Sequence, residues 1–160
     1  MREISTERIT EEIKAMCIRA ARELPADVLK AIEDAAKKEE SPVGRDVFVQ
    51  LCENARIAVE DSMPICQDTG VAIFFIEAGQ DVRITGGAFE EAVHEGVRRG
   101  YTEGFLRKSI VASPLPERIN TKDNTPAIIH TRIVPGDKLT IHFMAKGGGS
   151  ENMSRVAMLK

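Results

Sequence analysis

Apolar residues in the first third of the chain recur every three or four positions, the period of an amphipathic helix. The pattern predicts three helices: one between an N-cap at Ser5 or Thr6 and Pro25, one from about Ala26 into the polar stretch 37–41, and one from about Arg45 to Glu60. The apolar positions expected to pack inward are Ile9, Ile13, Met16, Cys17, Ala20, Ala21 and Leu24, then Val28, Leu29, Ile32, Ala35 and Ala36, then Val47, Phe48, Leu51, Cys52, Ala55, Ala58 and Val59.

After residue 61 the pattern changes to short apolar runs separated by turn residues. The predicted elements are a buried strand over 71–77, a short segment 82–85, a helix opened by Gly86-Gly87 and running to about Arg99, an ordered loop over 108–125, and two β-runs over 127–134 and 139–145. Pro135-Gly136-Asp137 joins the last two runs, and its residue types predict a hairpin turn between them.

These elements predict an α+β fold, in which an N-terminal helical layer precedes a mixed or antiparallel sheet with an interleaved helix. At 160 residues, the chain has the size of one domain, with residues 1–60 helical and residues 61–160 mixed. We expect the loops that carry chemistry to lie at one end of this domain. A glycine-rich segment only a few residues before Lys160 suggests a sequence cut from a longer one.

The composition narrows the function classes. A net charge of −3, with basic residues scattered among acidic ones, argues against a nucleic-acid groove. No apolar run approaches the roughly 20 residues of a membrane span, and the N-terminus lacks the apolar core of a signal peptide, so we expect a cytoplasmic protein. Three cysteines without a paired spacing predict thiols instead of a disulfide framework or a zinc ribbon.

The three cysteines differ in their surroundings. Cys17 and Cys52 lie in helical apolar stripes, where cysteine acts as a small hydrophobic residue. Cys66 lies in the polar turn Cys66-Gln67-Asp68-Thr69-Gly70, where a thiolate could ligate a metal or attack an electrophile. The alternative is a structural turn in which Asp68 and Thr69 bond only local backbone.

Other polar candidates admit both functional and structural readings on sequence alone. Arg107 could bind an anion or be a solvated surface residue, and Gly147-Gly148-Gly149 could be an anion nest or a simple turn. The glycine segment lacks the spacing of a P-loop, so nucleotide binding is not expected. We expect His94 to be exposed and His130 and His142 to be structural. Lys146, Glu151 and Asn152 could line a site or hold the glycine segment.

Four motifs follow one another in a recognisable order: Cys66-Gln67-Asp68-Thr69-Gly70, Gly104-Phe105-Leu106-Arg107-Lys108-Ser109, Asn120-Thr121-Lys122-Asp123-Asn124-Thr125-Pro126-Ala127 and Lys146-Gly147-Gly148-Gly149-Ser150-Glu151-Asn152. Together they resemble the N-terminal part of the alpha subunit of class I fumarases and L-tartrate dehydratases. The resemblance covers essentially the whole chain. It is specific because four separate motifs agree, whereas any one alone would be weak.

The resemblance implies a reversible, non-redox hydration of a small dicarboxylate, fumarate first and L-tartrate second. It implies a 4Fe-4S cluster with Cys66 as one of three cysteine ligands; the other two lie downstream of the glycine segment in the family, and Cys17 and Cys52 do not match them. It assigns Gln67, Asp68, Arg107 and Gly149 to substrate binding. Asp68 is also a candidate general acid, a role that requires a protonated carboxyl near neutral pH, which burial favours.

The resemblance also implies a beta subunit as partner, in a hetero-oligomer such as a heterotetramer, or a homodimer. Two alternatives from other classes stay open: a non-catalytic scaffold that lacks the cluster, and a cysteine-nucleophile enzyme that uses Cys66. The second is disfavoured because no Cys–His arrangement is visible in the sequence.

Overall fold

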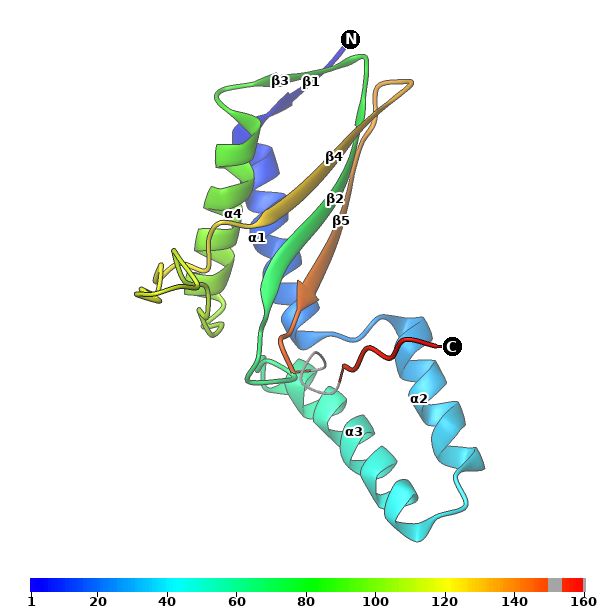
Figure 1. The fold of residues 1–160 in the computed structure, drawn as a ribbon. Coiled ribbons are helices and arrows are strands. Elements are labelled where there is room, and N and C mark those ends of the chain that lie inside the picture. The colour runs from blue at the N-terminus through cyan, green and yellow to red at the C-terminus, as the bar shows by residue number, and fades with distance from the viewer. Residues whose placement is uncertain (150–153, 160) are drawn as a thin grey trace.

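The fold, seen in a computed structural model that describes residues 1–149 and 154–159, combines four helices with five strands (Figure 1). In chain order the described elements are β1 (Arg2–Ser5), α1 (Thr6–Arg22), α2 (Ala26–Lys38), α3 (Pro42–Glu60), β2 (Val71–Gly79), β3 (Val82–Thr85), α4 (Phe89–Glu103), β4 (Ile128–Val134) and β5 (Leu139–Lys146). The predicted α+β class is confirmed. Each described helix is too short or too polar to cross a bilayer.

The hairpin predicted at Pro135-Gly136-Asp137 is wrong, because the three-stranded sheet has the order β4-β2-β5. Strand β4 runs parallel to β2 and β5 runs antiparallel to it, so β2 separates the two strands that the turn connects. The turn crosses over the end of β2 instead, where the Asp81 N–H donates to the Gly136 carbonyl at 2.9 Å. Strand β2 takes the centre since it is the most apolar run of the chain, and a central position buries it on both edges.

Helices α1 and α4 lie side by side against one face of this sheet (Figure 1). Each follows a strand of the parallel pair β1 and β3, so the two helices run in the same direction. Ser5 caps α1 as predicted, by accepting a hydrogen bond from the Arg8 N–H. Helix α4 extends four residues beyond the predicted end at Arg99, because Gly100 lies against Cys17 of α1 and permits close packing there.

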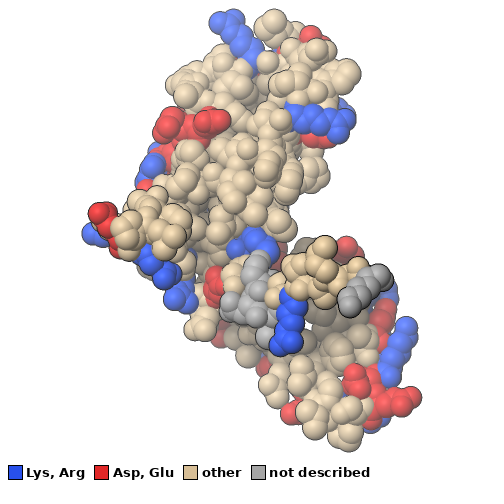
Figure 2. Space-filling view, viewed as in Figure 1, with Lys and Arg blue, Asp and Glu red and all other residues tan. Residues whose placement is uncertain are grey.

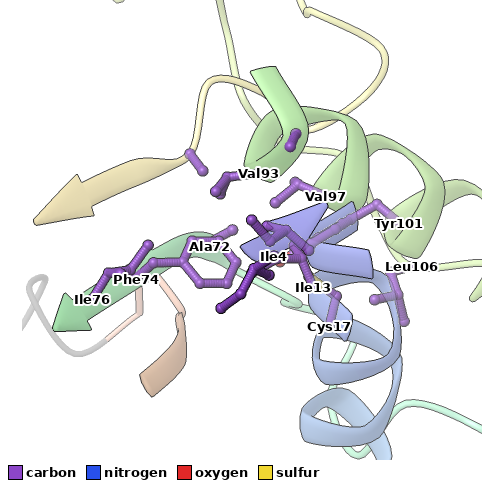
Figure 3. Close-up of a cluster of buried hydrophobic side chains, with 13 residues drawn as sticks. Ile4, Ile13, Cys17, Ala72, Phe74, Ile76, Val93, Val97, Tyr101 and Leu106 are labelled. Atoms are coloured by element: carbon purple, nitrogen blue, oxygen red, sulfur yellow. The ribbon is translucent and has the colours of Figure 1, made fainter. Parts of the chain in front are cut away.

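The apolar core fills the space between these helices and the inner face of the sheet (Figure 3). Its largest fully buried side chains include Ile9 and Ile13 of α1, Val93 and Val97 of α4, and Phe74 of β2. Phe74 and Phe143 of β5 pack with ring centroids 5.0 Å apart. The core therefore joins the first helix to the sheet, and the loops that precede β2 and follow β5 extend from this packed core.

Helices α2 and α3 form an arm that stands apart from this core (Figure 1). The stripes predicted to pack inward are only partly covered: Val47, Leu51 and Val59 remain 44–54% exposed, and in α3 only Ala55 and Ala58 are buried. The two helices pack on each other on one side, while large apolar side chains on their other sides stay exposed, among them Val43 and Val49. Charged side chains cluster on this arm, whereas much of the body seen in the same view is neutral (Figure 2).

Candidate functional site

The three thiols occupy different environments. Cys17 of α1 is 1% exposed, and burial raises the pKa of its thiol to about 12, which makes it an inert core residue, as predicted. Cys52 is half-buried on α3. Cys66 is exposed in the turn before β2, and its Sγ accepts a hydrogen bond from the Asp68 N–H at 3.4 Å. Only Cys66 combines exposure with a polar turn.

The residue before Cys66 is held from two sides. The Ile65 N–H donates to the Ala21 carbonyl at the end of α1 (2.8 Å), and the Ile65 carbonyl accepts a hydrogen bond from the Asn54 side chain of α3 (2.9 Å). These bonds connect the turn to both the core helix α1 and the arm. The position of Cys66 therefore depends on the junction between the arm and the body.

Asp68 organises the turn with both of its carboxylate oxygens. Oδ1 accepts a hydrogen bond from the Gly70 N–H at 3.1 Å, which closes a local Asx turn. Oδ2 accepts a hydrogen bond from the Gly148 N–H at 2.8 Å, across a sequence separation of 80 residues. Asp68 therefore forms the local turn of the structural alternative and, in addition, a bond to the distant backbone of the glycine segment.

Gly70 is where the turn and the glycine segment come closest. Its φ is +72°, and a Cβ at this position would lie 2.5 Å from the carbonyl carbon of Lys146 and 2.8 Å from the N atom of Gly147. Any side chain would therefore overlap backbone atoms as well as strain the left-handed conformation. Glycine here lets the start of β2 and the end of β5 meet closely.

The backbone of Arg107 is held by a buried neighbour and by a hydrogen bond from another segment. Leu106 is buried in the core, and the Thr69 hydroxyl donates to the Arg107 carbonyl at 2.7 Å. The guanidinium itself is exposed and forms no hydrogen bond or ion pair within the described part of the chain. Its backbone is thus fixed while its five N–H donors remain available to a ligand.

A cavity of about 670 Å³ collects these groups. Its lining comprises Gln67, Asp68, Gly70, Val71, Arg107, Ser109, Ile110, Lys146, Gly147, Gly148 and Gly149. All four residues predicted to bind substrate therefore line one cavity, although they come from three separate segments. Among the described residues of this lining, Arg107 and Lys146 are positively charged and Asp68 is the one carboxylate, and the Lys146 ammonium also donates to the Gly147 carbonyl. Such a lining suits a small anion.

The loop that carries Asp123 packs beside this region through charged and polar bonds. The Asp123 carboxylate accepts hydrogen bonds from the Thr125 N–H and hydroxyl, at 3.0 and 2.8 Å, and pairs with Arg98 of α4 at 3.0 Å. Partial burial acts against its charged form, but these hydrogen bonds outweigh it and lower the pKa of Asp123 to about 2. The loop is therefore tied to α4.

The remaining predictions divide into three groups. The prediction that His94 is exposed is wrong: the residue is half-buried, and its Nε2 atom is buried without a hydrogen-bond partner among the described residues. His130 stacks on Phe75 at 5.1 Å on the open face of the sheet, and His142 pairs with Phe75 in register, so neither lines the cavity. Ser150, Glu151 and Asn152 lie outside the described residues.

Sequence reasoning missed the backbone partners of the site. Asn124 belongs to one of the four motifs and Tyr101 to none of them, yet both residues are fully buried and bond to the turn that holds Asp68. A signal was available for Tyr101: it is the only tyrosine of the chain, and a tyrosine on an apolar helix stripe needs a polar partner for its hydroxyl.

A larger groove of about 1040 Å³ runs between α2 and α3, and it contains none of the predicted site residues. Its lining is mainly apolar, with acidic residues around it, and it lacks the convergent polar groups of the cavity at Asp68. Within residues 1–149 and 154–159, no set of three or more His, Cys, Asp or Glu side chains could hold a metal ion.

Comparison with known proteins agrees with the motif order. Residues 10–160 match the model of a family described as fumarate hydratase (Fumerase). The chain belongs to this family. It is 35% identical over 157 residues to a putative L(+)-tartrate dehydratase subunit alpha of Methanocaldococcus jannaschii, an alignment that covers 96% of this chain. It is also 42% identical over 107 residues to the anaerobic class I fumarate hydratase of Escherichia coli and 39% identical over 130 residues to the aerobic one, covering 66% and 80% of this chain.

This fumarate hydratase family chain spans only part of those relatives. The alignments cover 55% of the tartrate dehydratase subunit and 19% and 23% of the two E. coli enzymes.

Proposed function

We propose that this chain supplies one side of the active site of a hydro-lyase that reversibly hydrates fumarate to malate. The observation that supports this best is the single cavity in which Gln67, Asp68, Arg107 and Gly149 meet, next to the exposed thiol of Cys66. Its mixture of cationic side chains and backbone N–H groups matches a dicarboxylate better than a neutral or cationic ligand.

Substrate binding would divide between side-chain and backbone donors. The Arg107 guanidinium would hold one carboxylate of the substrate in a bidentate pair, because its donors are fixed in a fork that matches two carboxylate oxygens. The glycine segment would offer the N–H of Gly149 at a point where a bare Cα allows close approach, since no described atom beyond the chain neighbours lies within 4 Å of the position of a Cβ there. The Gln67 amide would orient the same ligand.

Asp68 would give a proton to the departing hydroxyl in the dehydration direction, so that it leaves as water, and take the proton back during hydration. The carbon-bound proton would go to a base that the beta part of the site supplies. Its Oδ1 and Oδ2 atoms are held by the N–H groups of Gly70 and Gly148, so the carboxyl keeps one orientation at the cavity wall. Fixed orientation of an acid toward the reacting atoms is what general acid catalysis requires.

Cys66 suits one cluster ligand, because it is exposed and its Sγ already accepts a backbone hydrogen bond of the kind that tunes ligating thiolates. When bound, a 4Fe-4S cluster held by three cysteines would supply an iron with an open position that acts as a Lewis acid on the substrate. We propose that the two further cysteines come from outside the described chain, and that a beta subunit or the equivalent region completes the site, in a hetero-oligomer or homodimer. Cytoplasmic location stays a prediction.

Dehydration of L-tartrate is the second candidate. It is favoured by one observation: the relative that aligns with 96% of this chain is named as a putative L(+)-tartrate dehydratase subunit alpha. Tartrate differs from malate by one further hydroxyl, and the residues that would recognise it need not lie in this chain. A scaffold without a cluster and an enzyme with a Cys66 nucleophile remain the alternatives from other classes.

The test is an anaerobic preparation of the complete alpha polypeptide with its beta partner, assayed with fumarate, L-malate and L-tartrate. We expect hydration of fumarate and a rise in KM of at least tenfold in Arg107→Lys, which keeps the charge but loses the fork. The matched control is Arg83→Lys, which changes an exposed arginine of β3 that faces Glu3. This variant should leave KM unchanged. Absence of activity toward all three acids would contradict the proposal, and activity with tartrate alone would select the second candidate.

A further inference from the structure

A buried set of hydrogen bonds lies directly behind the candidate cavity. Tyr101 projects from α4 at the edge of the core and is 1% exposed (Figure 3). Its hydroxyl donates to the Thr69 carbonyl at 2.8 Å and lies 3.3 Å from the Gly70 carbonyl. Burial raises the pKa of Tyr101, so the phenol keeps the proton that it donates.

Asn124 connects the same turn to the segment of Arg107. Its side chain is 0% exposed; Nδ2 donates to the Gly70 carbonyl at 3.1 Å, and Oδ1 accepts a hydrogen bond from the Ser109 N–H at 2.9 Å. Its backbone φ is +63°, a left-handed conformation that Asn tolerates better than most residues. One amide thus spans two segments 54 and 15 residues away in sequence.

The Thr69 hydroxyl adds a third connection, because it donates to the Arg107 carbonyl at 2.7 Å. The Thr69 carbonyl therefore accepts a hydrogen bond from Tyr101, and the Thr69 hydroxyl donates one to Arg107. Asn124 in turn bonds Gly70 and Ser109. Each of these groups is buried or partly buried, so water cannot readily replace a lost partner. The network sets the distance between the turn of Asp68 and the segment of Arg107.

We infer that Tyr101 and Asn124 are positioning residues, which hold Gln67 and Asp68 at a fixed separation from Arg107 and Ser109 without touching the ligand. Neither side chain lines the cavity, whereas Gly70 and Ser109, to which Asn124 is bonded, do line it, and so do Asp68 and Arg107 beside Thr69 and its hydrogen-bond partner. A binding site built from segments that are distant in sequence loses affinity when the distance between them varies, because one ligand can no longer contact both segments at once. The expected change in KM rests on the proposed function, whereas the expected change in hydrogen exchange does not.

The kinetic test uses the complete alpha polypeptide with its partner and compares Tyr101→Phe and Asn124→Asp with wild type. Phenylalanine removes only the hydroxyl, and aspartate keeps the acceptor for Ser109 while losing the donor to Gly70. Thr10→Val is the matched control, because the buried Thr10 hydroxyl donates to the Ala92 carbonyl at 3.0 Å in the helix pair, away from the cavity. We expect KM for fumarate to rise about tenfold or more in both variants, with a smaller change in kcat, and to stay within twofold in Thr10→Val.

A structural measurement on the same proteins is independent of activity. Hydrogen exchange of the segment 104–110 should become at least tenfold faster in Tyr101→Phe and unchanged in Thr10→Val, at matched thermal stability. If Tyr101→Phe and Asn124→Asp match Thr10→Val in both KM and exchange, the positioning role is wrong. If wild type hydrates no acid while exchange still responds to Tyr101→Phe, the proposed function fails and the positioning role stands.

Discussion

The Oδ2 atom of Asp68 accepts a hydrogen bond of 2.8 Å from the backbone N–H of Gly148, joining the turn that carries Cys66 to the glycine segment after β5. Because Oδ1 of the same carboxylate accepts the Gly70 N–H, one side chain holds two segments at the cavity. Asp68 therefore has a structural task in addition to the proposed proton transfer.

The Asp68→Asn variant tests the structural task, and an amide in the central strand shows whether the effect is local or a general unfolding. An asparagine presents one acceptor oxygen instead of two, so we expect the Gly148 amide to lose its partner and to exchange about tenfold faster, in line with the loss of one hydrogen bond. The Ile76 amide, in the central strand, serves as the internal control and should keep its rate. Unchanged protection at Gly148 would contradict the account.

Gly70→Ala should be among the most damaging small substitutions near the site. The new Cβ would lie 2.5 Å from a backbone carbon of Lys146, where neither partner can rotate away, and φ is positive. We expect a loss of unfolding free energy of about 3 kcal/mol or more. Gly136→Ala is the control, since its φ is +100° but no atom lies within 4 Å of the added Cβ, so only the conformational cost of about 1–2 kcal/mol applies. Equal losses in urea titrations of the two variants would show that the contact at Lys146 is not tight.

Gly96→Ala tests the close packing of α1 on α4. Helix propensity alone favours alanine by about 1 kcal/mol, yet the added Cβ would meet the Cβ of Ile13 at 2.6 Å and the Thr10 carbonyl at 2.8 Å. We expect overpacking to win and the melting temperature to fall. Gly44→Ala in α3, where the Cβ meets only the movable Glu39 side chain, should be neutral or stabilising. A stabilised Gly96→Ala variant would contradict the helix packing described above.

The charge on Asp123 makes the protein sensitive to acid. Its folded-state pKa is lowered from 3.8 to about 2, so its contribution to stability is fully present above pH 4 and disappears as the pH falls through 2. The shift corresponds to about 2 kcal/mol. In Asp123→Asn we therefore expect lower unfolding free energy at pH 6, with the difference from wild type shrinking toward pH 2. A difference that is independent of pH would show that the loop is held by neutral hydrogen bonds alone.

The helices and the distinct position of Cys66 among the cysteines were predictable because both depend on local sequence. The apolar period marked α1, and the polar turn after Ile65 singled out Cys66 among three cysteines. The strand order was not predictable from the turn at Gly136, since turn residues permit a reversal of the chain but do not say which strand lies between its arms. That order follows from the burial of β2, a property of the whole sheet.

The network behind the cavity was missed for a related reason. Tyr101 and Asn124 bond to backbone carbonyls of Thr69 and Gly70, and backbone groups leave no trace in the identity of the residues that carry them. The side chains that line the cavity could be proposed from their motifs, whereas the partners that place them required the fold.

The central claim is that Cys66, and no other thiol of this chain, helps to build a hydro-lyase active site. The most direct test is the rate of fumarate hydration, together with iron content, in anaerobically prepared complete enzyme carrying Cys66→Ser or Cys52→Ser. We predict that Cys66→Ser loses hydration and cluster iron while Cys52→Ser, on the arm, keeps both. Equal activity and equal iron in the two variants would contradict the account.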